Sequence, residues 1–338
     1  MTTETTATGW RVRMTPHRVW IGFRGHWVTV VGVGAVIGLV FAVNPGKVAG
    51  ALTHASPALL LIMLPVVLSL YGIRGITWFV VVRASGQPVG LAQALRVTLI
   101  SQMFVFLPGG DLWKVPLVKQ EDGSATDAGV ITGTIVFDDL VYLFVLTFAM
   151  VPVVVATPVL SIPLAVALLP QVVIFAILLS PAVYRALSAR VGNLRPFRRF
   201  RPELELLGPS FRSLVRVRTV LLVMALDVIA ASLAIALFAL ALASVHATGS
   251  DLSHVAFTYS ASQVVTNLTV IPGALGAYEG MMTGAMALEG VAPAAAATGT
   301  LLYRIANDVV MALIGVAIVL VYDRDRLGAI GRAGRSSG

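Results

Sequence analysis

The chain has 338 residues, of which 57% are hydrophobic and 12% are charged, and it has no cysteine. This share of charge is about half of what an ordinary soluble domain contains, and several apolar runs reach the ~20 residues that cross a hydrocarbon core. The composition therefore indicates an all-α integral membrane protein, excludes disulfides and cysteine-based metal sites, and gives no reason to expect a cofactor.

Six apolar runs are long enough to cross a bilayer as helices. The first follows a basic segment, an order that secretory signal peptides also have. No clear small-residue cleavage site comes after it, so we expect an uncleaved first span. The six predicted spans are Trp27–Val43, Pro57–Val82, Thr126–Val153, Leu160–Leu179, Thr219–Leu242 and Pro293–Val321.

The net charge of +8 comes mainly from arginines in three segments, residues 1–24, 183–218 and 322–338. In a soluble protein such clusters would point to nucleic acid. In a membrane protein they follow the positive-inside rule, because cytoplasmic segments are enriched in Lys and Arg. We therefore expect no nucleic-acid partner, but cytoplasmic tails at 1–24 and 322–338 and a cytoplasmic loop at 183–218 within a transmembrane domain at 25–321. A secondary role in holding anionic lipid headgroups stays open.

Two further apolar pieces fit no simple crossing. Ala92–Leu107 runs into Pro-Gly-Gly-Asp, and Leu252–Ile271 runs into Pro-Gly-Ala-Leu-Gly. If the first piece crossed the membrane alone, the basic loop would lie outside, against the positive-inside rule. We therefore predict six crossings plus two re-entrant helical hairpins, the first entering from the cytoplasm and the second from outside.

The two predicted hairpins open sequence units that resemble each other. Unit one, residues 92–153, contains SQMFVFLPGG and then TGTIVFD, whereas unit two, residues 252–321, contains SQVVTNLTVIPGALG and then TGTLLYR. Similar units that enter from opposite faces form an inverted repeat, and transporters of this plan place their site between the repeats near the midplane. The alternative is a chance recurrence of Gly, Thr and Pro in an apolar chain.

Asp138 and Arg304 occupy the same place in the two TGT copies. Counted along their predicted helices, each lies roughly 15–18 Å deep, near the centre of a ~30 Å core. A charge at that depth costs at least about 2.5–3.5 kcal/mol, so we expect pseudo-symmetry to bring the two together. Such a pair would either fix helix packing only or form a substrate or coupling site, and intramembrane charge favours the second reading.

Other charged residues in the apolar segments are candidates for the same site. Asp308 follows Arg304 by one turn and would pair with it on one helix face. Asp139 has no such partner in its own helix, so it would be neutral or would titrate during transport. Arg74 would contribute to the site or extend toward the cytoplasmic interface. The candidates for proton coupling are Asp138, Asp139 and Asp227.

The proline-glycine bends would break the two hairpins at membrane depth, where irregular backbone persists only if it is buried or lines a wet cavity. The arm after each bend begins with free N–H groups and a positive dipole end, which suit phosphate or carboxylate. Alternatively, Asp111 and Glu279 only cap these arms, and Lys114 either meets an anionic headgroup or faces water. The residues assigned to the site here are Pro108, Gly109, Gly110, Pro272, Gly273, Gly276, Glu279 and Lys114.

Glycines and tryptophans receive structural roles. Gly129 and Gly133 are four residues apart, a spacing that favours close helix packing. Trp78 and Trp113 are expected to anchor helices at the membrane interface rather than to contact a ligand.

The stretches PGGD, TGTIVFDDLVYL, IPGALGAYEG and LLYRIANDVV resemble the lysylphosphatidylglycerol synthase transmembrane-domain family, which includes the flippase half of bacterial multiple-peptide-resistance proteins. The resemblance covers most of residues 57–321. Where the first repeat of that family often has Glu-Arg, this chain has Asp138-Asp139, which removes a phosphate partner. The aminoacyl-transferase domain of larger relatives has no counterpart here, so we expect a stand-alone member that is not an enzyme. The sharpest part of the match comprises Pro272, Gly273, Gly276, Glu279 and Arg304.

The resemblance implies a multi-pass protein of a prokaryotic plasma membrane that moves lipids or lipid-linked headgroups. Arg304, with Arg74 and the bend amides, would hold a phosphate, while Asp138 and Asp139 would contact a hydroxylated or cationic headgroup part or carry protons. Candidate cargoes are anionic or aminoacylated phospholipids and polyprenyl-phosphate sugars. The alternatives are a small-anion or amphiphile carrier and a non-transporting accessory subunit that docks a membrane enzyme through Arg185–Arg218. A second copy of the chain also stays open as a partner.

Overall fold

The computed structural model describes residues 45–105, 110–122, 127–157, 161–194, 198–247, 249, 251–267 and 276–322. Helices are the only regular elements in these ranges, as the composition predicts. A helix pairs its backbone N–H and C=O groups within its own segment, which is what a chain needs where no water is present. The predicted span Trp27–Val43 and both chain ends lie outside the described residues.

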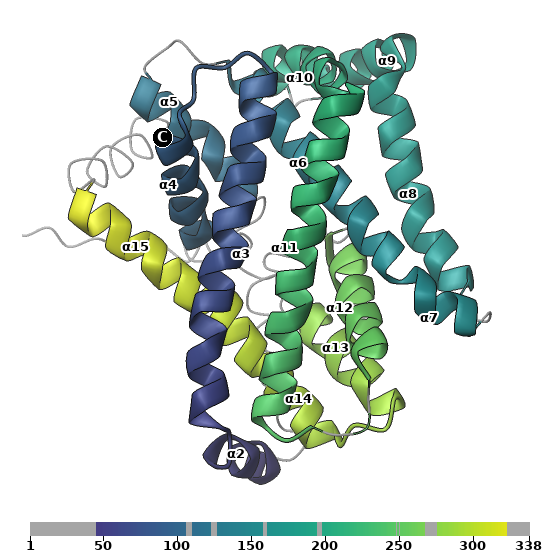
Figure 1. Ribbon diagram of the computed structural model, residues 1–338. Helices are drawn as coiled ribbons and strands as arrows, with labels where there is room; N and C mark the ends of the chain where they lie inside the picture. Colours follow the sequence, from purple (N-terminus) through teal and green to yellow (C-terminus); the bar gives the residue numbers. More distant parts are fainter. Residues whose placement is uncertain are drawn as a thin grey trace, which may run out of the picture.

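Four long helical units form the frame of the molecule (Figure 1), and each is long and apolar enough to cross a membrane. Large apolar side chains stay exposed on them, for example Leu61 at 73%, Leu221 at 61% and Leu313 at 62%, as expected where helices face lipid rather than water. Four of the predicted spans are thereby confirmed as helices. The units are α3 (Pro57–Ala84), α6 with α7 (Ala128–Ala149, Val151–Ala156), α11 (Val217–Ser244), and α14 with α15 (Pro293–Arg304, Met311–Tyr322).

A fifth candidate span is bent. Helix α8 (Ser161–Leu179) coincides with the predicted Leu160–Leu179 span, and the chain then turns by 97° into α9 (Pro181–Gly192). The segment expected to be a basic loop is therefore largely helical, because α9 is followed by α10 (Arg201–Leu214). Both helices lie at one end of the molecule (Figure 1), here called the basic end.

The two apolar pieces that fit no simple crossing each form a pair of short helices. Helices α4 (Leu91–Ser101) and α5 (Lys114–Asp122) lie in the half near the basic end, whereas α12 (Leu252–Asn267) and α13 (Ala277–Leu288) lie in the opposite half, toward α2 (Pro45–Thr53) (Figure 1). The pieces therefore sit at opposite ends of the frame. The bend residues Pro108, Gly109, Pro272 and Gly273 lie outside the described residues.

The glycines of the two TGT copies both allow close approach between helices. A Cβ atom on Gly133 would lie 2.8 Å from the Ser210 side chain of α10, and one on Gly299 would lie 2.8 Å from the Leu242 side chain of α11. Gly129 meets α10 in the same way, since its Cβ would lie 2.6 Å from the Glu203 carbonyl oxygen. The packing role predicted for Gly129 and Gly133 is confirmed.

The close approach of Gly133 to α10 predicts how a single added methyl group changes the stability of the protein. We expect Gly133→Ala to destabilise the protein by about 1–3 kcal/mol, because the added methyl overpacks the α6–α10 contact. Gly72→Ala is the matched control, since a Cβ there meets nothing within 4 Å and alanine favours helix. Thermal unfolding in detergent measures both, and equal melting temperatures for the two variants would contradict the packing argument.

The arrangement also predicts which segments share a side of the membrane. The Ser56 backbone N–H donates to the Ser244 carbonyl at 2.8 Å, which ties the start of α3 to the end of α11 away from the basic end. Because the chain has no cysteine, Ala189→Cys in α9 and Ser253→Cys at the start of α12 are clean reporters. We expect an impermeant thiol reagent to label them from opposite sides of sealed vesicles. Labelling of both from one side would exclude this topology.

Candidate functional site

An arginine and an aspartate meet between α3 and α6. Arg74 Nη2 lies 3.4 Å from Asp139 Oδ1, and the guanidinium carbon lies 4.4 Å from the centre of the Tyr142 ring. The Asp139 side chain is 42% exposed, whereas that of Arg74 is 16% exposed. Arg74 Nη1 is buried and has no hydrogen-bond partner among the described residues. The guanidinium is thus neutralised on one side and has an N–H group free for an acceptor.

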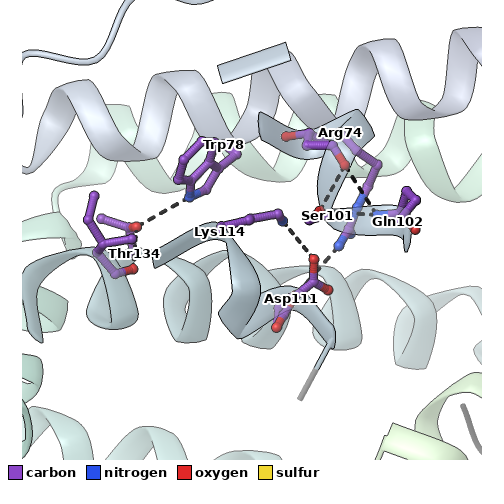
Figure 2. Close-up of polar contacts among 10 residues, drawn as sticks. Arg74, Trp78, Ser101, Gln102, Asp111, Lys114 and Thr134 are labelled. Atoms are coloured by element: carbon purple, nitrogen blue, oxygen red, sulfur yellow. Dashed lines mark hydrogen bonds and ion pairs between the residues drawn. The ribbon is translucent and has the colours of Figure 1, made fainter. Parts of the chain in front are cut away.

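Helix α5 adds a lysine to this cluster. Lys114 Nζ lies 2.8 Å from Asp111 Oδ1 and 5.6 Å from the centre of the Trp78 ring, and Lys114 is only 3% exposed. Figure 2 shows Arg74 and Lys114 extending toward Asp111 from α3 and from α5. Lys114 therefore does not face water. We call Arg74, Asp139, Asp111 and Lys114 the first cluster.

Trp78 is not the interfacial anchor that the sequence led us to expect. It is fully buried, and its Nε1 donates to Thr134 Oγ1 at 3.3 Å (Figure 2). Tryptophan is enriched at interfaces because its N–H needs a partner there. Here a threonine of the first TGT copy supplies that partner, so the ring can pack in the core beside Lys114.

A second cluster surrounds Arg304. Its Nε lies 3.0 Å from Glu279 Oε1 and its Nη1 lies 2.6 Å from Asp308 Oδ2. Glu279 and Asp308 are each 2% exposed. The i,i+4 pair of Arg304 with Asp308 was predicted, and Glu279 is a further partner that comes from α13. We call Arg304, Glu279 and Asp308 the second cluster; it holds one cation between two carboxylates.

Glu279 also caps its own helix. Its Oε2 accepts the backbone N–H of Gly276 at 2.6 Å, and Gly276 has a φ of 82°. Glycine adopts this left-handed backbone without strain, so Gly276 can end the irregular segment and start α13. The capping role predicted for Glu279 is confirmed, and the same side chain also pairs with Arg304.

A π-helical segment, Ile305–Val310, places the last acid of the second cluster. Such segments are rare and often occur at functional sites. Within it, Asn307 Nδ2 donates to Asp308 Oδ1 at 2.7 Å, and the Tyr71 hydroxyl donates to the Asn307 carbonyl at 3.4 Å. Sequence reasoning missed this segment, because its apolar pattern does not differ from that of an α-helix.

Aromatic side chains join the two clusters. The Tyr142 and Tyr259 hydroxyls lie 3.3 Å apart, and Tyr259 meets Tyr303 edge-on with ring centres 5.8 Å apart. Tyr278 stacks on Tyr303 at 6.2 Å, and the Arg304 guanidinium lies 5.1 Å from the Tyr278 ring centre. With Arg74 over Tyr142, these rings form a continuous aromatic seam between the arginines. Only the aromatic position in the TGTLLYR copy hinted at it.

The predicted pair of Asp138 with Arg304 does not form. Arg304 takes its carboxylates from its own repeat unit, and Arg74 takes Asp139 from α6. Asp138 is 1% exposed, and its Oδ1 has no hydrogen-bond partner among the described residues. Consecutive helix residues point about 100° apart, so Asp139 can face Arg74 while Asp138 turns inward.

One known protein family matches the part of the chain that contains both clusters. A sequence model described as lysylphosphatidylglycerol synthase TM region matches residues 27–315, a range that includes both clusters. The chain belongs to this family. A search of curated proteins gave no match. The lysylphosphatidylglycerol synthase resemblance seen in the sequence is therefore confirmed, and the motifs that indicated it lie beside Glu279 and Arg304.

The ion pairs of the second cluster predict that Glu279 and Arg304 are strongly coupled in their effects on stability. Glu279→Gln removes one carboxylate from a buried arginine, and breaking a buried pair costs about 3–5 kcal/mol. We expect the double variant Glu279→Gln/Arg304→Gln to lose less stability than the two single losses added together.

The control is Glu289→Gln. This residue lies in a half-exposed pair with His254 at 3.3 Å, where a change of at most about 1 kcal/mol is expected. Unfolding of all four variants in detergent gives the coupling energy. Additive losses for Glu279 and Arg304 would show that the two residues act independently.

Proposed function

We propose that this protein moves the headgroup of a membrane lipid across a prokaryotic plasma membrane without changing it chemically. The cargo is a lipid with an anionic group, such as an anionic or aminoacylated phospholipid or a polyprenyl-phosphate lipid. The headgroup passes between the two clusters while the acyl or prenyl chains stay in the bilayer. Membership of the lysylphosphatidylglycerol synthase transmembrane-region family supports a role at the membrane. The charged residues of the two clusters support binding of an anionic headgroup.

One observation carries the proposal: Arg74 Nη1 is buried without a hydrogen-bond partner among the described residues, beside a carboxylate that is 42% exposed. A buried N–H of a charged group that lacks an acceptor costs about 1–3 kcal/mol or more. A phosphate oxygen would satisfy it, and Lys114 lies in the same cluster to neutralise the remaining charge. Asp139, the accessible acid, would meet a cationic or hydroxylated part of the headgroup.

The arrangement of the short helices supports movement between two sides. We interpret α4–α5 and α12–α13 as re-entrant hairpins that enter from opposite faces, which makes the two repeat units an inverted repeat. The basic end then faces the cytoplasm, because the segment 183–218, which includes most of α9 and all of α10, is rich in arginine. Transporters built this way expose a midplane site to one side and then to the other. The aromatic seam would give the headgroup a continuous polar-aromatic surface between the two clusters.

Removing the charge of Arg74 tests the function. The purified protein is placed in phosphatidylcholine vesicles that contain a trace of fluorescent phosphatidylglycerol, lysyl-phosphatidylglycerol or undecaprenyl phosphate, and an impermeant quencher reports the outer leaflet. We expect Arg74→Gln to slow translocation of at least one probe by 10- to 100-fold, because a charge-assisted hydrogen bond contributes about 1.5–3 kcal/mol.

Arg83→Gln is the matched control, since Arg83 is an exposed arginine of the same helix. It should leave the rate unchanged. Equal rates for wild type and Arg74→Gln with every probe would refute the proposed transport role.

The same assay addresses the alternative of an accessory subunit. The arginine-rich segment Arg185–Arg218 would suit docking to a membrane enzyme, and an accessory subunit would leave all three probes unmoved in pure vesicles. Its partner's activity would then survive Arg74→Gln and fall when arginines of this segment are replaced.

A further inference from the structure

Two buried aspartates lie outside both clusters, and within the described part of the chain neither has a counter-charge at ion-pair distance. Asp227 of α11 is 0% exposed, and neither of its oxygens has a hydrogen-bond partner among the described residues. Asp138 of α6 is 1% exposed, and its Oδ1 is also unpartnered. An ionised carboxylate in such surroundings is costly, whereas a protonated one is not. These oxygens require a ligand that neutralises them.

The two aspartates lie at the same depth as Arg74. Asp138 in α6, Asp227 in α11 and Arg74 in α3 are each ten residues from the helix end nearest the basic end. At 1.5 Å per residue this is ~15 Å, half of a ~30 Å hydrocarbon core. Helix α11 packs against both α3 and α6, so the three side chains come from neighbouring helices at one level.

Charged or titratable groups lie on each of the helices that pack most against α11. Among the described elements these helices are α3, α6, α12 and α14. The charges that bear on Asp227 are those of Asp138, Arg74 and Asp139. Arg74 is the cation among these three groups, and it is already paired with Asp139. The groups on the packing elements are Tyr71 and Arg74 of α3, Asp138, Asp139 and Tyr142 of α6, His254 and Tyr259 of α12, and Tyr303 and Arg304 of α14.

We propose that Asp138 and Asp227 form a proton-binding site that couples movement of the lipid headgroup to a proton gradient. The inference rests on the proposed transport function, which it deepens by naming the coupling ion. When no headgroup is bound at the first cluster, Asp138 and Asp227 together hold one proton, because two neighbouring carboxylates cannot both ionise at low cost. When a headgroup is bound to Arg74, the two aspartates hold two protons.

The coupling runs through Arg74. A lipid phosphate on Nη1 of Arg74 cancels the positive charge that stabilises the second carboxylate. The pair then takes up one further proton from water as the headgroup binds, and releases it when the headgroup leaves. Headgroup and proton therefore cross the membrane together, one proton for each lipid. No bond other than the carboxyl O–H forms or breaks.

A sodium ion is the competing ligand, and the geometry favours a proton. Metal ions need several oxygen ligands around one point, whereas the described residues contain no group of three or more His, Cys, Asp or Glu that could hold a metal ion. A proton needs only one carboxyl oxygen. Sodium coupling is thus one outcome of the test that would overturn the proposal.

Infrared spectroscopy tests the proton site without relying on transport. At neutral pH the purified wild-type protein should show the C=O band of a buried carboxylic acid that resists exchange with bulk water. We expect Asp227→Asn and Asp138→Asn each to alter or remove this band. Asp127→Asn, at the exposed start of α6, is the matched control and should leave it unchanged. A wild-type spectrum that lacks the band, or variants that keep it, would overturn the proposal.

A pH gradient across the vesicles described above tests the coupling. A gradient of one pH unit should shift the leaflet distribution of a translocated probe by up to tenfold, since one unit corresponds to 1.36 kcal/mol per proton. In Asp227→Asn the probe should equilibrate without responding to the gradient. An unchanged response in this variant, or a response to sodium instead, would reject proton coupling while leaving the transport role standing. If the wild type moves no probe, the transport role fails and the infrared result alone decides the proton site.

Discussion

Charge buried inside apolar helices must be compensated, and this constraint organises the molecule. Arg304 lies between two carboxylates that are each 2% exposed, so the second cluster is held together by ion pairs that would be costly to separate. Glu279 accepts the backbone N–H of Gly276, whose φ is 82°, and also pairs with Arg304. The same carboxylate therefore links the start of α13 to the buried arginine.

The two halves meet this constraint differently, although their sequences resemble each other. In unit two the TGT copy leads to an arginine that is neutralised within its own unit. In unit one it leads to Asp138 and Asp139, and the cation comes from α3, outside the unit. The reversal of sign between the copies does not produce a pair across the repeat. The second cluster holds one cation between two carboxylates. Among the described residues, Arg74 of the first cluster keeps a spare N–H group, and Asp138 and Asp227, outside both clusters, keep spare carboxyl oxygens. These are the groups at which binding and coupling are proposed.

Glycine sets the distances over which these groups meet. Gly133 and Gly299 bring α6 against α10 and α14 against α11 so closely that a methyl group on either would lie 2.8 Å from a neighbouring side chain. Without a hydrophobic driving force between helices in lipid, such close packing is a main source of association. The residue beside Gly133, Thr134, also receives the N–H of Trp78. The repeated TGT motif thus contributes to packing in both halves and to the polar network in one.

The sequence by itself determined the class of the protein, the helical segments and the family, because apolar length, charge content and short motifs are local properties. It also predicted the Arg304–Asp308 pair from the i,i+4 spacing and offered the Glu279 cap as one of two alternatives, which the structure then showed. Only the tertiary structure decided that Asp139 pairs with Arg74, that Trp78 is buried and that Asp138 and Asp227 have unpartnered oxygens within the described part of the chain. The Trp78–Thr134 and Arg74–Asp139 contacts join residues that are 56 and 65 positions apart. Whether such contacts form depends on how whole helices rotate and pack.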